Sequence, residues 1–165
     1  MNNKKLLRGI FFLAIGVALI AWSPKPAMAD IIWSSDIRLT NALGASRDPS
    51  IAVDPSGNVH IAWFDFRDGN WEIHYTKLDN NGNTLVGDTG LTNAVGDSSP
   101  SIATDSSGNV HIAWHDTRDG NTEIYYTKLD NNGNTLVGDT RLTDDSGQSD
   151  GASIAVYSYN DIHIA

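Results

Sequence analysis

A segment of 41 residues that occurs twice is the feature of this sequence that most constrains its fold. Residues 49–89 return as residues 100–140, at a spacing of 51 residues and with six positions changed. A shorter third copy, SIAVYSYNDIHIA, follows at residues 153–165. Self-similarity at this period is the signature of a repeat architecture, in which each copy is one supersecondary unit that buries its apolar sides against neighbouring copies.

Within one copy the apolar residues form four short clusters separated by Gly, Asn, Asp and Pro, and no window has the 3.6-residue period of a helix. This pattern predicts strands at residues 50–53, 59–64, 72–78 and 84–86, the last one running on to Leu91. Asp54-Pro55-Ser56-Gly57 has the composition of a type I turn between the first two strands. Asp68-Gly69 predicts a two-residue hairpin loop, and Asn81-Gly82 has the same chemistry.

Four antiparallel strands in about 50 residues, repeated without a helix, predict an all-β fold and specifically an incomplete β-propeller of tandem four-stranded antiparallel blades. The predicted blades are residues 49–91 and 100–142, with a truncated blade at 153–165. An outer strand is expected at residues 30–40, because DIIWSSDIRLT aligns with the end of each fourth strand. Closed propellers have about four to eight blades, so the chain is expected to be a fragment of a longer protein or to self-associate until a ring closes.

The first 29 residues have the features of a secretory signal peptide. A basic start precedes an uncharged, mostly apolar run of 14 residues from Gly9 to Trp22, and Ala27-Met28-Ala29 is a small-x-small cleavage site. An uncleaved membrane anchor is the alternative. Cleavage after Ala29 predicts a secreted, periplasmic or cell-surface chain without membrane association.

The mature chain is strongly acidic. Seven Lys and Arg face 20 Asp and Glu, which gives a net charge of −13. Such a surface repels phosphate backbones and anionic membranes, so no nucleic-acid partner is expected. The sequence has no cysteine, so stability must come from packing alone.

The motifs of one copy resemble the TolB-type β-propeller repeat. The matching residues are Leu39-Thr40, Pro49-Ser50, Asp54-Pro55-Ser56-Gly57, Asp65, Arg67-Asp68-Gly69-Asn70, Glu72-Ile73, Tyr75 and Leu91-Thr92. The resemblance covers nearly the whole mature chain and implies a propeller, a fold found in periplasmic binding proteins, peptidase accessory domains and cell-surface proteins. The chain is more distantly similar to bacterial neuraminidase (sialidase) repeats, although it lacks their S-x-D-x-G-x-T-W box.

Residues that recur identically in each copy are expected to serve the blade rather than a catalytic site, because such a site on a propeller is normally singular. A turn-capping and ion-pair network is therefore predicted, with acid and base work by paired carboxylates as the alternative. Its members are Asp65, Arg67, Asp68 and Glu72, with their copies Asp116, Arg118, Asp119 and Glu123.

No metal, cofactor or catalytic signature is predicted. His60, His111 and His163 are expected to be buried histidines with satisfied hydrogen bonds rather than metal ligands. The segment 79–83 fails the EF-hand pattern, because Thr84 stands where Gly is needed and Gly90 where Glu is needed.

The positions that differ between copies are the informative ones. Two pairs, Val53/Thr104 and Pro55/Ser106, lie near the first turn, and four surround the second hairpin: Phe64/His115, Phe66/Thr117, Trp71/Thr122 and His74/Tyr125. One rim of the blades should collect these aromatic side chains together with the crossing that carries Arg47 and Asp48. Such a composition suits recognition of a protein or a carbohydrate ligand.

The sequence thus predicts a binding or scaffold module without chemistry of its own. The predicted ligand-binding residues are Phe64, Phe66, Trp71, His115, Arg47 and Asp48. Three alternatives stay open: Phe64 and Trp71 only cover the blade edge, the chain is the N-terminal fragment of a sialidase-like glycoside-active enzyme, or it is a purely structural surface repeat.

Overall fold

The computed structural model describes residues 35–94, 96, 98–157 and 161–165. The predicted signal peptide and residues 30–34 of the predicted outer strand lie outside these ranges. The chain divides into two units, Met1–Ser35 and Asp36–Ala165, and the second unit is the one described below. Among the described residues no helix is long and apolar enough to cross a membrane.

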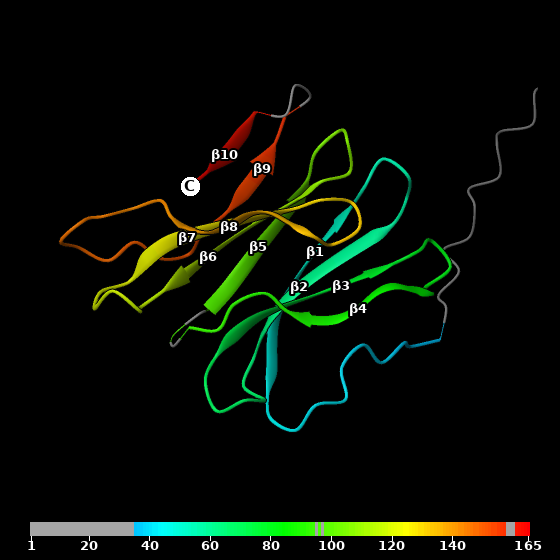
Figure 1. Ribbon diagram of the computed structural model, residues 1–165, viewed down its shortest axis with the longest axis horizontal. Helices are drawn as coiled ribbons and strands as arrows, with labels where there is room; N and C mark the ends of the chain where they lie inside the picture. Colours follow the sequence, from blue (N-terminus) through cyan, green and yellow to red (C-terminus); the bar gives the residue numbers. More distant parts are fainter. Residues whose placement is uncertain (1–34, 95, 97, 158–160) are drawn as a thin grey trace, which may run out of the picture. The chain divides into compact units, whose positions relative to one another are not determined.

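Each full copy of the repeat folds into a four-stranded antiparallel sheet in which strands adjacent in sequence pair in space (Figure 1). The first sheet consists of β1 (Ser46–Val53), β2 (Val59–Asp65), β3 (Glu72–Leu78) and β4 (Thr84–Gly90). The second sheet consists of β5 (Ser98–Thr104), β6 (Val110–Asp116), β7 (Glu123–Leu129) and β8 (Thr135–Arg141). The third copy contributes a two-stranded sheet of β9 (Ile154–Val156) and β10 (Ile162–Ile164). The prediction of an all-β chain built from tandem four-stranded antiparallel units is confirmed.

The turn predicted at Asp54 is confirmed in detail. The Gly57 N–H donates to the Asp54 carbonyl at 2.9 Å, and Gly57 has the positive φ of 84° that closes this turn. The Asp54 carboxylate accepts the N–H groups of Ser56 and Asn58, both at 2.9 Å. Asp79, Asp105 and Asp130 make the same contacts in their own turns.

The two-residue loop predicted at Asp68-Gly69 is wrong. Asp65 pairs with Glu72, so six residues, 66–71, connect β2 to β3. Gly69 does adopt the expected positive φ, of 94°. The prediction failed because the strands stop pairing at Asp65 and Glu72, before the chain reaches Asp68 and Gly69. This longer loop carries Phe66 and Trp71.

The first strand of each sheet begins earlier than predicted and contains a bulge. Arg47 pairs with Phe64 and Ser50 with Ala62, so two residues of β1, Asp48 and Pro49, stand opposite one residue of β2. Asp48 adopts a positive φ of 44°, and its counterparts Ser99 and Gly151 have φ values of 47° and 70°. Arg47 and Asp48 therefore belong to a strand and not to a crossing.

The three sheets pack in chain order through their first strands, with β1 against β5 and β5 against β9. The main core joins the facing sides of the first and second sheets and includes Phe64 and Tyr75 from one and Trp114 and Tyr125 from the other. A smaller cluster of Ile61, Trp63 and Leu78 covers the opposite side of the first sheet, where Leu39 packs against it. Residues 36–40 form no strand.

Candidate functional site

The end of the first sheet that holds the β2–β3 loop carries a cluster of three aromatic rings and one guanidinium group. The ring centroid of Trp71 lies 4.6 Å from that of Phe64 and 5.0 Å from that of Phe66, and both pairs are tilted. The guanidinium carbon of Arg47 lies 5.2 Å from the Trp71 centroid, within the range of a cation–π contact. We call Arg47, Phe64, Phe66 and Trp71 the aromatic–arginine cluster.

The members of this cluster differ in exposure. Phe64 is 7% exposed and belongs to the main core, whereas Phe66 is 41% exposed at the loop. Trp71 is half-buried and Arg47 is exposed. Since Phe64, Phe66 and Arg47 all contact its ring, Trp71 is held in one orientation, and the groups presented to solvent are the Phe66 ring and the Arg47 guanidinium.

The other two predicted ligand-binding residues, Asp48 and His115, lie outside this cluster. Asp48 is exposed at the bulge, and its carboxylate accepts a long hydrogen bond, 3.4 Å, from the Ser99 hydroxyl of the second sheet. His115 is the counterpart of Phe64 in the second sheet and pairs with Ser98. Its Nδ1 is buried and makes no hydrogen bond with the described residues.

In the first copy the recurring charged residues form two separate groups. Asp65 accepts hydrogen bonds from the side chain of Arg67 at 2.9 and 3.0 Å, and Arg67 also pairs with Asp88 at 2.7 Å. The hydrogen bonds from Arg67 outweigh the effect of burial and hold the pKa of Asp65 well below its usual range. Glu72 instead accepts a hydrogen bond from Asn70, at 2.9 Å, and Asp68 is exposed in the loop.

In the second copy one additional residue connects the charged groups. Arg141 stands where the first copy has Gly90, and it pairs with Glu123 at 2.9 Å and with Asp119 at 3.4 Å. Arg118 pairs with Asp116 and, at 3.2 Å, with Asp139. Its guanidinium carbon also lies 4.3 Å from the centroid of the Tyr125 ring, whose hydroxyl donates to Asp119.

Glu123 and Tyr125 are titratable groups of this network with shifted pKa values. The hydrogen bond from Thr143 leads the contacts that lower the pKa of Glu123, and the hydrogen bond from Arg141 adds to it. Burial and the neighbouring Asp119 raise the pKa of Tyr125 to about 12. Glu123 is therefore held as a carboxylate and Tyr125 as a neutral phenol at neutral pH, which favours a structural ion-pair role for both.

A second polar network lies at the opposite end of each sheet, behind the first turn. His60 lies 2.8 Å from the Tyr75 hydroxyl through Nδ1 and 3.3 Å from the Asp54 carboxylate through Nε2. The ammonium group of Lys77 lies 3.6 Å from the same carboxylate and donates to the Asn131 carbonyl of the second sheet at 2.8 Å. The second copy repeats the pattern with His111, Tyr126, Asp105 and Lys128.

Burial and hydrogen bonding set the charges in this network. Burial works against the ionised form of Asp54, but the hydrogen bonds from Asn58 and His60 outweigh it, so the pKa of Asp54 lies well below its usual range. Burial lowers the pKa of His60 despite the nearby carboxylate. The pair thus consists of a carboxylate and a neutral imidazole at neutral pH.

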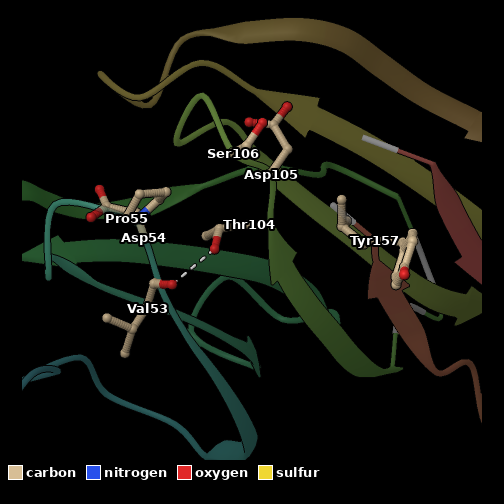
Figure 2. A pocket seen from close by; sticks show the side chains of 8 residues that line it. Val53, Asp54, Pro55, Thr104, Asp105, Ser106 and Tyr157 are labelled. Carbon is tan, nitrogen blue, oxygen red and sulfur yellow. Dashed lines mark hydrogen bonds between the residues drawn. The ribbon is translucent and has the colours of Figure 1, made fainter. Parts of the chain in front are cut away.

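A pocket of about 320 Å³ lies at this same end, where β1, β5 and β9 finish, and Figure 2 shows the side chains that line it. Corresponding positions of the three copies line it in chain order: Val53, Asp54 and Pro55, then Thr104, Asp105 and Ser106, then Val156 and Tyr157. Sequence reasoning assigned no site here. The signal that could have found it was present, because Val53/Thr104 and Pro55/Ser106 are two of the six changes between the full copies.

Among the described residues, no group of three or more His, Cys, Asp or Glu side chains is placed to hold a metal ion. No family model and no curated protein matches the chain. A crystal structure of a protein of unknown function from Dyadobacter fermentans DSM 18053 aligns with a TM-score of 0.55 and 11% sequence identity, over 74% of this chain and 46% of that one. The present chain therefore spans about half the length of that neighbour, and the likeness concerns the fold alone.

Proposed function

We propose that this chain is part of a secreted or periplasmic β-propeller of the TolB type that acts as a binding module, with the aromatic–arginine cluster as the site for a protein ligand. The signal-peptide features of residues 1–29 support export. The observation that carries the proposal is the placement of an exposed cation and an exposed aromatic ring, both in contact with the Trp71 ring, at the end of one sheet.

The packing of successive sheets supports the propeller arrangement. In such a fold each blade covers one side of the next, and the first strands gather around the central axis. β1, β5 and β9 contact in that order. Ile102, which faces the first sheet, is 6% exposed, whereas its counterpart Ile51 is 65% exposed. A further sheet packed on the first one would bury Ile51, either from a longer form of this protein or from a second copy of the chain.

The electrostatic situation of Arg47 supports a ligand-binding role for the cluster. Arg67, Arg118 and Arg141 all pair with carboxylates. Arg47 makes no ion pair with a carboxylate of the described residues, and its contact is the Trp71 ring. Arg and Trp are the side chains most enriched among residues that dominate protein–protein binding energies.

The second sheet contains the matched comparison. At the four positions of the cluster it carries Ser98, His115, Thr117 and Thr122, while its backbone register is the same. The two copies thus differ in the exposed groups and not in the scaffold. A protein ligand is favoured over a sugar here because the Trp71 ring already contacts three side chains, which leaves less of its surface for stacking on a pyranose.

A photo-crosslinking experiment in the producing cells tests this function. A benzophenone amino acid at position 66 of the full chain should crosslink to one reproducible polypeptide, and the same probe at position 117 should not. The purified polypeptide should then bind the chain at least tenfold more weakly when Arg47→Ser and Trp71→Thr are combined, because the cation and the ring are both removed. The sheet should still fold, since both replacements are the residues that the second copy carries at these positions. Equal crosslinking at the two positions, or unchanged affinity, would refute the proposal.

A further inference from the structure

The pocket in Figure 2 is a second candidate site, and it is independent of the binding proposed for the aromatic–arginine cluster. Its lining residues lie at the first turn of each copy, whereas the cluster lies at the β2–β3 loop. The two sites are therefore at opposite ends of β2. A volume of about 320 Å³ falls at the small end of the range of ligand pockets. The pocket exists only where three copies meet.

The floor of the pocket carries no available charge. Asp54 accepts hydrogen bonds from Ser56 and Asn58, and it also contacts His60 and the ammonium group of Lys77. Asp105 has the equivalent contacts, including Lys128 at 3.4 Å. Each carboxylate is therefore compensated from within the sheets, which leaves neither a site for a cation nor an attraction for an anion.

The walls of the pocket combine apolar surface with hydroxyl groups. Val53 is 58% exposed and Tyr157 is 66% exposed, and Pro55 is also exposed. The Thr104 hydroxyl donates to the Val53 carbonyl at 2.9 Å, the contact drawn in Figure 2, so its oxygen remains able to accept a hydrogen bond. Tyr157 supplies an aromatic face and a hydroxyl that can both donate and accept.

The aromatic ring comes from one of the positions where the third copy differs from both full copies. Tyr157 stands at the position of Asp54 and Asp105, whose carboxylates cap the turn in the first two copies. If the third copy kept the turn of the first two, it would have a third buried Asp at this position. The substitution instead puts an exposed phenol against the strand ends of its neighbours.

We propose that this pocket binds a neutral saccharide. A pyranose ring has an apolar C–H face that packs on Tyr157 and hydroxyl groups that pair with Thr104 and Tyr157, and it carries no charge that the compensated floor would have to match. Charged sugars bind more weakly, because both an ammonium group and a carboxylate lose hydration without gaining a partner of opposite charge.

The test is a titration of the full chain with four neutral disaccharides, maltose, cellobiose, lactose and chitobiose, followed by saturation-transfer NMR and calorimetry. At least one should bind with a Kd in the millimolar range or below, and glucuronate and glucosamine should bind at least tenfold more weakly. Tyr157→Asp, which restores the residue of the other copies, should weaken binding at least tenfold without changing the melting temperature. Leu85→Thr on the exposed face of β4 is the matched control and should leave the affinity unchanged.

Three results would overturn the inference: no binding by any neutral disaccharide at 10 mM by either method, equal affinity of Tyr157→Asp and the parent chain, or tighter binding of the charged sugars. Thr104→Val provides a second variant, because it keeps the shape of the side chain and removes the hydroxyl. It should weaken binding about threefold. Failure of protein binding at the cluster is measured separately with Arg47→Ser, which should leave the saccharide affinity unchanged.

Discussion

The turns at Asp54 and Asp79 make the same local hydrogen bonds in different surroundings, so replacing each by alanine separates turn capping from buried charge pairing. Each carboxylate accepts two backbone N–H groups and the side-chain amide of the Asn four residues later. Asp54 is 4% exposed and also contacts His60 and Lys77. Asp79 lies in an exposed turn.

Asp54→Ala should cost far more stability than Asp79→Ala. It removes the turn contacts and also leaves the buried Lys77 ammonium group and His60 Nε2 without their carboxylate. Removing one partner of a buried ion pair costs about 3–5 kcal/mol. For a unit of this size each kcal/mol corresponds to about 2–4 °C, so the melting temperature should fall by about 6–20 °C. Asp79→Ala loses only the turn contacts and should cause a much smaller fall.

Thermal unfolding of the full chain followed by circular dichroism at pH 7 measures both variants, and urea unfolding gives the free energies. Asp54→Asn is the control that keeps the size of the side chain but removes its charge, and it should lie close to Asp54→Ala if pairing with Lys77 dominates. Equal falls in melting temperature for Asp54→Ala and Asp79→Ala would show that the reasoning about the buried pair is wrong.

Burial lowers the pKa of His60 and of His111, so the stability that their neutral forms contribute is fully present above the unfolded pKa of about 6.5. The free energy of unfolding should therefore fall as the pH drops from 7 to 5. In urea titrations the double variant His60→Asn with His111→Asn should show a flatter dependence of this free energy on pH. Gly90→Arg should stabilise the first sheet by about 0.5–1 kcal/mol in the same assay, since a Cβ there makes only an ordinary 3.5 Å contact with His74 and glycine is costly within a strand; a loss of stability would contradict this. A double-mutant cycle with Arg47→Ser and Trp71→Thr should give a coupling of about 0.5–1 kcal/mol for the cation–π contact, and zero coupling would show that the two side chains do not interact.

Much of the fold could be predicted because the repeat was visible and its turns have specific chemistry. Asp54, Gly57 and their counterparts mark the turns through an acceptor and a positive φ, and both are local properties of the sequence. The six-residue loop at 66–71 could not be predicted in the same way. Whether Asp68-Gly69 closes a tight hairpin depends on where Asp65 and Glu72 leave the ladder. The contacts that hold Asp65 include Ser46 of the neighbouring strand β1, as well as Trp63 of β2 itself.

The candidate sites show the same division. Comparison of the copies located Phe64, Phe66 and Trp71, because the second copy forms the same four-stranded sheet without these side chains, so the fold of the sheet does not require them. It could not show that Arg47 lies over Trp71, since that contact depends on the pairing of Arg47 with Phe64 across the bulge. The pocket at Tyr157 was missed because its walls come from three copies, and each copy contributes residues that are unremarkable when read alone.

The contact of Lys77 with Asn131 gives the series of copies a direction. The Lys77 ammonium group contacts Asp54 of its own copy and also donates to the Asn131 carbonyl in a turn of the following copy, and its side chain is 6% exposed whereas that of Lys128 is 24% exposed. A duplicated unit inserted between the first two copies would place its own turn against the Lys77 ammonium group and its own lysine against the turn at Asn131. Adding whole copies would therefore preserve this contact between a lysine and the turn of the following copy, whereas inserting part of a copy would interrupt it.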